Sequence, residues 1–178
     1  MEITSITMLK PAYGTAAPPH RLAGEMVPLT AFDRAAFDIF VPMVFAYNAP
    51  SPSNDAVKDG LAMALAAFPL MAGRLTLAAD ANRRRHRRHI HVNDGGALVV
   101  EAKFAGADMD DVLAGVIATA ELYPAPPEDC IGAALLQVKL TRFRCGGLVV
   151  GLIVHHHLVD GHSTNAFTAT WARAIEMY

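Results

Sequence analysis

Residues 147–156, GLVVGLIVHH, constrain the fold more than any other stretch, because apolar side chains occupy consecutive positions up to the two histidines. In a strand, successive side chains point to opposite faces, so both faces of this segment are apolar and need to be covered. The preceding run AALLQVKLTRF, residues 133–143, is also typical of a strand, and Cys145-Gly146-Gly147 connects the two runs. The pair predicts the centre of a sheet.

The clearest helix is expected after Ser53, which is a suitable N-cap, with Asp55 in the first turn and Pro69 as the stop signal. Its apolar residues recur at helical spacing and so define one face that packs on the sheet. These residues are Val57, Leu61, Leu65 and Phe68.

The remaining pattern predicts an α/β fold with a mixed sheet and flanking helices. Two further helices are expected over residues 108–122 and 161–178. Asn93-Asp94-Gly95-Gly96 is typical of a turn that joins two strands. The other strands are expected at residues 2–10, 26–30, 38–47, 73–79, 87–94 and 96–104.

Length and composition indicate one well-buried domain over residues 1–178, since 53% of the residues are hydrophobic and 18% are charged. The formal net charge of −2 provides no field that would recruit nucleic acid or an anionic membrane. No apolar run is long enough to span a bilayer, and the N-terminus lacks the features of a signal peptide. Cys130 and Cys145 show no metal-ligand spacing, so a cytoplasmic protein with reduced thiols is expected.

The segment HHHLVDGHS, residues 155–163, is the candidate for chemistry. An imidazole has a pKa near neutrality and can accept a proton from an attacking hydroxyl or amine. A carboxylate four residues later can fix the local geometry, and a following glycine permits a tight turn. Only His156 has this separation from Asp160, with Gly161 next in the chain.

Three other interpretations of the cluster are open. The histidines can simply end a strand, or His155 and His157 can bind a metal on one strand face with Asp160 and His162 nearby. A serine nucleophile is a weaker alternative, because Ser163 does not lie in a Gly-x-Ser-x-Gly elbow.

The basic run NRRRHRRH, residues 82–89, contains five of the fifteen lysines and arginines. It lacks interleaved aromatic residues that would stack on bases, so nucleic-acid binding is disfavoured. A solvated turn between two strands is expected instead.

Four segments in the same order resemble the N-terminal half of the plant BAHD acyltransferases, which transfer acyl groups from acyl-CoA to alcohols or amines. They are VPLTAFDRAAFDIFVPMVFAY, LAMALAAFPLMAGRL, IHVNDGGALVVEA and HHHLVDGHS. Peptide-synthetase condensation domains share the His-His-x-x-x-Asp-Gly pattern, but the upstream segments favour BAHD. The resemblance implies a chloramphenicol-acetyltransferase-like fold, of which this chain is the N-terminal half only.

The resemblance implies that His156 is the general base and that Asp160 is structural, paired with an arginine of a second domain. Gly161 would allow the turn that holds the imidazole beside the substrate tunnel. Acyl-CoA would be a co-substrate, and neither a bound cofactor nor a metal is expected.

MEITSITMLKPAYG and VPLTAFDRAAFDIFVP most resemble the subgroup that acylates agmatine, putrescine or tryptamine with hydroxycinnamoyl groups. Phe40, Phe45 and Tyr47 are candidates to line the acyl or acceptor pocket, with an ordinary core position as the alternative.

The Asp-Phe-Gly-Trp-Gly motif of the family's second domain does not occur in these 178 residues. The chain is therefore expected to be inactive alone and to self-associate through an exposed domain interface. A catalytically dead relative that acts as a binding module, or a metal-binding domain built on the histidine cluster, are the alternative functions.

Overall fold

The computed structural model describes residues 1–14, 20–79, 86–106, 108–115 and 119–176. Its main feature is a five-stranded mixed sheet in the order β1-β6-β7-β8-β3, in which only β6 and β7 run parallel. A smaller antiparallel sheet has the order β2-β5-β4. The strands are β1 (Glu2–Leu9), β2 (Met26–Pro28), β3 (Phe40–Tyr47), β4 (Arg74–Ala79), β5 (His86–His91), β6 (Ala97–Phe104), β7 (Leu136–Phe143) and β8 (Leu148–His155).

The expected central strand is confirmed. All eight residues of β8 are buried, and β7 and β3 flank it on either side. At Gly151 the carbonyl group of Leu122 lies so close that no Cβ would fit. This glycine therefore lets the segment after the 3-10 helix at Thr119–Glu121 lie directly on the strand.

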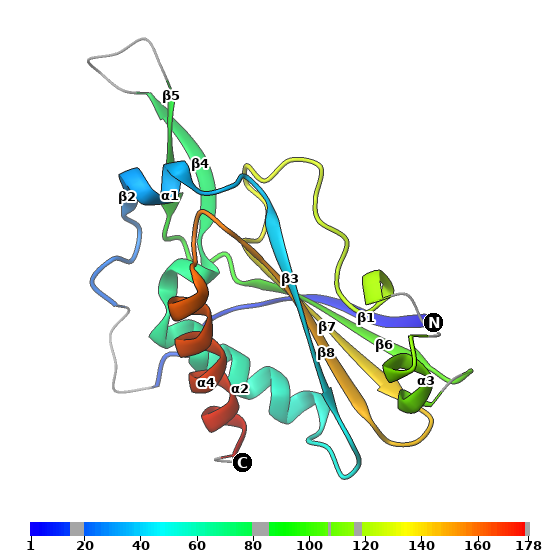
Figure 1. The fold of residues 1–178 in the computed structure, drawn as a ribbon. Helices are drawn as coiled ribbons and strands as arrows, with labels where there is room; N and C mark the ends of the chain where they lie inside the picture. Colours follow the sequence, from blue (N-terminus) through cyan, green and yellow to red (C-terminus); the bar gives the residue numbers. More distant parts are fainter. Residues whose placement is uncertain (15–19, 80–85, 107, 116–118, 177–178) are drawn as a thin grey trace.

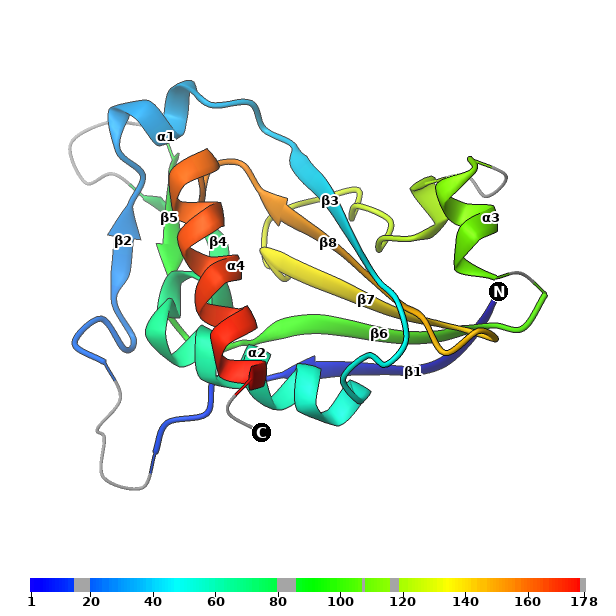
Figure 2. The same cartoon turned by 60° about the horizontal axis from the view of Figure 1, so that its bottom comes forward.

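Helices α2 (Asn54–Ala67) and α4 (Gly161–Glu176) lie side by side and cover one face of the large sheet (Figures 1 and 2). The Ser53 side chain accepts a hydrogen bond from the Ala56 backbone N–H, which confirms the predicted N-cap. The core between helices and sheet includes Val57, Leu61, Leu65, Val138, Leu152, Phe167 and Trp171.

On the opposite face, the short helix α3 (Met109–Leu113) lies far from the small sheet (Figure 1). The prediction of one helix over residues 108–122 is wrong. Gly115 has a φ of +76°, which ends helical geometry, and the next described residues form a 3-10 turn at Thr119–Glu121. Residues 107 and 116–118 lie outside the described part.

Two other local predictions differ from the structure. The turn at residues 93–96 does not close a hairpin, because β5 and β6 belong to different sheets. A five-residue helix, α1 (Ala31–Ala35), lies between the two predicted extended pieces, and Thr30 and Asp33 form a reciprocal capping box at its start. Among the described residues, no helix is long and apolar enough to cross a membrane.

Candidate functional site

Three histidines lie where β8 ends, and their side chains divide between the two sides of the strand. His155 and His157 are 1% and 6% exposed, whereas His156 is partly exposed. His155 is the last residue of β8, whereas His156 and His157 belong to the turn that follows it. The sequence cluster is therefore two separate environments in space.

His156 lines a hollow of about 230 Å³ together with residues from β3 and from the start of α4, among them Val41, Asp160, Gly161 and Thr164. The His156 backbone N–H donates to the Ile39 carbonyl at 2.9 Å, which fastens the strand end to the segment before β3. The Nδ1 atom of the ring is buried and has no hydrogen-bond partner within the described ranges. An imidazole that borders an open hollow is suited to accept a proton from a bound molecule.

Asp160 caps helix α4. Its Oδ1 accepts hydrogen bonds from the Ser163 backbone N–H at 2.8 Å and from the Ser163 hydroxyl at 2.7 Å. The Asp160 backbone N–H donates in turn to Ser163 Oγ at 2.9 Å. These hydrogen bonds lower the pKa of the exposed Asp160 carboxyl below its usual value. The motif aspartate thus organises the first turn of the helix that borders the His156 hollow.

Gly161 is the first residue of α4, and its φ does not lie in the left-handed region. The turn therefore does not require glycine for conformational reasons, unlike the expectation from the sequence. A Cβ at this position would meet nothing within 4 Å. What the missing side chain provides here is open space beside His156.

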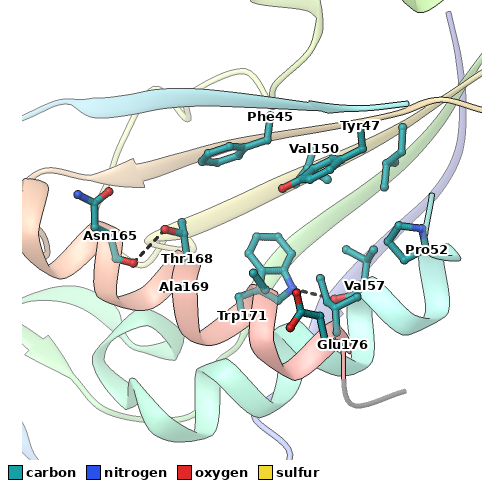
Figure 3. A pocket seen from close by; sticks show the side chains of 13 residues that line it. Phe45, Tyr47, Pro52, Val57, Val150, Asn165, Thr168, Ala169, Trp171 and Glu176 are labelled. Atoms are coloured by element: carbon teal, nitrogen blue, oxygen red, sulfur yellow. Dashed lines mark hydrogen bonds between the residues drawn. The ribbon is translucent and has the colours of Figure 1, made fainter. Parts of the chain in front are cut away.

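A second hollow, of about 720 Å³, lies between β3 and α4. Figure 3 shows Phe45 and Tyr47 of β3 facing Thr168 and Trp171 of α4 across it, with Glu176 near the far end. Asn165 lines both this hollow and the one that contains His156. The two hollows therefore adjoin, and we call them together the β3–α4 groove.

The walls of the groove follow the periodicity of the two elements. Val41, Met43, Phe45 and Tyr47 alternate along β3 and share one face, whereas Phe40 lies on the other face. The Phe40 ring instead packs edge-on against His155, with 4.9 Å between ring centroids. The structure thus separates Phe40 from Phe45 and Tyr47. The sequence did not predict that α4 forms the second wall of the groove. Its lining residues Asn165, Thr168 and Glu176 are ordinary residues for an exposed helix face.

On the side of β8 that faces away from the groove, His155 and His157 lie close to the Asp38 carboxylate. The Asp38 Oδ1 lies 3.2 Å from His155 Nε2 and 3.8 Å from His157 Nδ1, and Arg88 binds the other carboxylate oxygen at 2.6 Å. Burial pushes the pKa of Asp38 upward, but the hydrogen bond and charge of Arg88 outweigh it and hold that pKa below its usual value. Burial, followed by the neighbouring His157, lowers the pKa of His155 to about 4.

This arrangement corrects the expectation for the basic run. Residues 86–89 belong to strand β5, and Arg88 points to Asp38 instead of forming part of a solvated turn. Residues 82–85 lie outside the described part. Neither Asp38 nor Arg88 could be singled out from the sequence, because their pairing depends on how the small sheet sits against β8.

The metal alternative needs different ligands from those expected. Within the part of the chain that the structure describes, Asp38, Cys130 and His155 bring ligand atoms within 4.8 Å of one another, and Asp160 and His162 are not in that group. The His157 backbone N–H donates to His155 Nδ1 at 3.3 Å, so the neutral ring carries its proton on Nε2. A protonated Nε2 donates to Asp38 and has no lone pair for a metal.

Comparison with known proteins matches nearly the whole chain. The model of the Transferase family matches residues 1–176. Tryptamine benzoyltransferase 2 of Oryza sativa subsp. japonica is 68% identical over 178 residues, which cover 98% of this chain and 39% of the relative. Agmatine hydroxycinnamoyltransferase 1 of the same organism is 39% identical and matches 98% of this chain and 38% of its own length. The chain thus spans about two fifths of the length of these relatives.

Solved structures share the fold. Vinorine synthase superimposes with a TM-score of 0.62 at 23% identity, over 96% of this chain and 42% of its own. TRI101 of F. sporotrichioides, crystallised with coenzyme A and T-2, has a TM-score of 0.62 at 15% identity, over 85% of this chain and 41% of its own.

Proposed function

Because the chain belongs to the Transferase family of BAHD acyltransferases, we propose that it forms the histidine-bearing part of an enzyme that moves an acyl group from acyl-CoA to an amine. The observation that carries this proposal is the position of His156 at one end of the β3–α4 groove, beside the capped start of α4. The relatives named for tryptamine and agmatine support an amine as the acceptor.

In this proposal His156 acts as the general base. It takes a proton from the acceptor nitrogen while that nitrogen attacks the thioester carbonyl, so the C–N bond forms and the C–S bond breaks. Coenzyme A leaves as a thiolate that takes up the proton from His156, which restores the neutral imidazole. Because the thioester is already activated, the reaction needs neither a covalent enzyme intermediate nor a metal.

Asp160 has a structural role in the proposal. It holds the first turn of α4, and with it the wall that faces His156. Because its carboxylate is exposed, it remains accessible to an arginine of a second domain, as the family resemblance implies. It is not needed as a proton relay.

The β3–α4 groove is proposed to hold the aromatic part of a substrate. Phe45, Tyr47 and Trp171 offer ring faces and edges that suit a benzoyl, hydroxycinnamoyl or indole ring. Glu176 at the far end supplies a carboxylate for a cationic group. Phe40 is left out of this role, because it packs on His155.

A further domain is proposed to close the site over the bound thioester. We expect no acyl transfer by the 178-residue chain alone, since the open β3–α4 groove cannot enclose the thioester and exclude water.

The test uses a chimera in which this chain is followed by the C-terminal part of tryptamine benzoyltransferase 2. Release of coenzyme A thiol is measured with benzoyl-CoA or p-coumaroyl-CoA and with tryptamine or agmatine. Amine-dependent release by the chimera, but not by the chain alone, is the expected result. His156→Ala should lower the rate by about 10²-fold or more, the usual contribution of a general base, whereas His157→Ala should keep most of it. If His157→Ala lowered the rate more than His156→Ala, the proposal would have assigned the general base to the wrong histidine.

A further inference from the structure

Asp38 lies immediately before the segment that holds the backbone of His156. The Ile39 carbonyl accepts the His156 N–H at 2.9 Å, and the Asp38 carboxylate is 3.2 Å from the ring of His155. Residues 38 and 39 therefore contact two successive residues at the end of β8. A change at Asp38 would be transmitted to His156 through both connections.

The Asp38 carboxylate is itself oriented from the small sheet. Arg88 of β5 binds Oδ2 at 2.6 Å, which leaves Oδ1 directed at His155 and His157. A carboxylate that is bound through both oxygens has little rotational freedom. The position of Oδ1 is thus fixed by an element far from β8 in the sequence.

The other nitrogen of His155 is also engaged. The His157 backbone N–H donates to Nδ1 at 3.3 Å, so the ring carries its proton on Nε2 and donates it to Asp38. The groups that face this ring are Asp38, Arg88, His157, the Cys130 thiol and the Phe40 edge. The buried, neutral ring of His155 thus has one defined tautomer. It links the Asp38 carboxylate to the backbone N–H of His157, the residue that follows His156.

From these contacts we infer that Asp38 is a positioning residue for His156, acting through the neutral ring of His155 and the carbonyl of Ile39. The inference rests on the proposed role of His156 as the base. Asp38 does not reach the groove, because it borders a different hollow, together with Arg88 and His155. Asp38 therefore affects catalysis only through the position of the His156 imidazole.

A divalent cation on Asp38, Cys130 and His155 is the competing interpretation of the same group. Two contacts oppose it. The proton on His155 Nε2 occupies the position that a metal would need, and the positive charge of Arg88 lies on the same carboxylate. Burial and the nearby Asp38 also raise the pKa of the Cys130 thiol, which disfavours the thiolate that binds metals.

The first experiment measures ring tautomers in the 178-residue chain by two-bond ¹H–¹⁵N correlation of the histidine rings. In the wild type, His155 should show a protonated Nε2 and an unprotonated Nδ1 at pH 7. Asp38→Ala should convert it to a mixture of tautomers and should also shift the His156 ring signals. Unchanged His156 signals in Asp38→Ala would overturn the inference, and so would direct coordination of His155 by added Zn²⁺.

The second experiment measures kcat and KM in the chimera described above. Asp38→Ala should lower kcat by about tenfold or more while KM changes little, because small misplacements of a catalytic group are costly. Asp38→Asn keeps an oxygen that accepts from His155 and should recover part of the loss. Glu128→Gln is the matched control, since Glu128 borders the same hollow without a contact to His155.

Equal kcat values for Asp38→Ala and the wild type would overturn the inference, as would equal losses in Glu128→Gln. If the wild-type chimera shows no transfer, the proposed function fails, and the tautomer experiment still decides whether Asp38 orders the His156 ring. If Asp38→Ala does not fold, Asp38→Asn provides both measurements.

Discussion

At the scale of single residues, neighbouring histidines have opposite tasks. His156 borders the groove, whereas His155 and His157 are buried behind the strand beside Asp38. The motif aspartate, four residues further on, is a helix cap in this structure. One short segment thus combines a candidate base with the residues that hold it in place.

Stability should depend on pH through His155. Burial is the main cause that lowers the pKa of His155 to about 4 in the folded chain. Between about pH 6.5 and 4 the unfolded chain therefore binds one proton more than the folded chain. The stabilisation is complete above pH 6.5 and is lost as the pH falls through this window. Between pH 7 and pH 5 the loss should be about 2 kcal/mol. Urea unfolding at both values tests this, and His155→Gln should flatten the difference. An equal slope in both proteins would contradict it.

The cap on α4 should contribute to stability without a role in proton transfer. Asp160→Ala leaves the N–H of Ser163 without its acceptor, and the midpoint of thermal unfolding should fall. Asp160→Asn keeps an oxygen acceptor and should lie close to the wild type. A loss for Asn as large as that for Ala would show that the capping oxygen is not what stabilises this turn.

At the scale of secondary-structure elements, β8 is the centre of the chain. It pairs with β3 and β7 and carries the histidines at its end. Helices cover one of its faces, and Leu122 and Tyr123 pack against Gly151 on the other. Trp171 Nε1 donates to the Val57 carbonyl at 2.9 Å, which ties α4 to α2 across the same face of the sheet. The groove exists because α4 leaves β3, the edge strand, partly uncovered.

Two glycines near the site should respond differently to the same substitution. Gly151→Ala would place a Cβ against the Leu122 carbonyl, and a clash with backbone in a packed core should cost more than about 3 kcal/mol. Gly161→Ala meets open space and should leave the free energy of unfolding nearly unchanged. Denaturant unfolding of both variants measures the contrast, and similar losses would contradict the packing described for β8.

At the scale of the whole molecule, the small sheet connects to the large one through specific polar contacts. Arg74, the first residue of β4, donates to the carbonyls of Gly95 and Gly96 at 2.8 Å, just before β6. Arg88 makes the corresponding link to Asp38 on the other side. The small sheet therefore holds Asp38 through Arg88, although it contributes no residue to the groove.

The chain is expected to self-associate. Phe32 and Phe37 are 88% and 75% exposed, and Ile39 beside them is 51% exposed, so a group of large apolar side chains faces solvent around α1. Light scattering after size exclusion should give masses above that of one 19.0 kDa chain. The double variant Phe32→Ser and Phe37→Ser should shift the protein toward the monomer. A monodisperse wild-type monomer would contradict this expectation.

The sequence by itself determined the α/β class, the central position of β8 and the Ser53-capped helix. Its spacing also singled out His156 and Asp160, which line the same hollow. These features depend on local periodicity, on capping residues and on short spacing along the chain. It could not show that α3 ends at Leu113, because a glycine within a helical pattern, such as Gly115, does not by itself mark the end of the helix.

Only the tertiary structure decided which side each histidine faces, that Phe40 is separated from Phe45 and Tyr47, and that Asp38 and Arg88 meet behind His155. The same holds for the groove, whose two walls come from β3 and α4, more than a hundred residues apart in the chain. The physical reason is that local pattern fixes each element, whereas the contacts between distant elements depend on how two sheets and their helices bury apolar surface together.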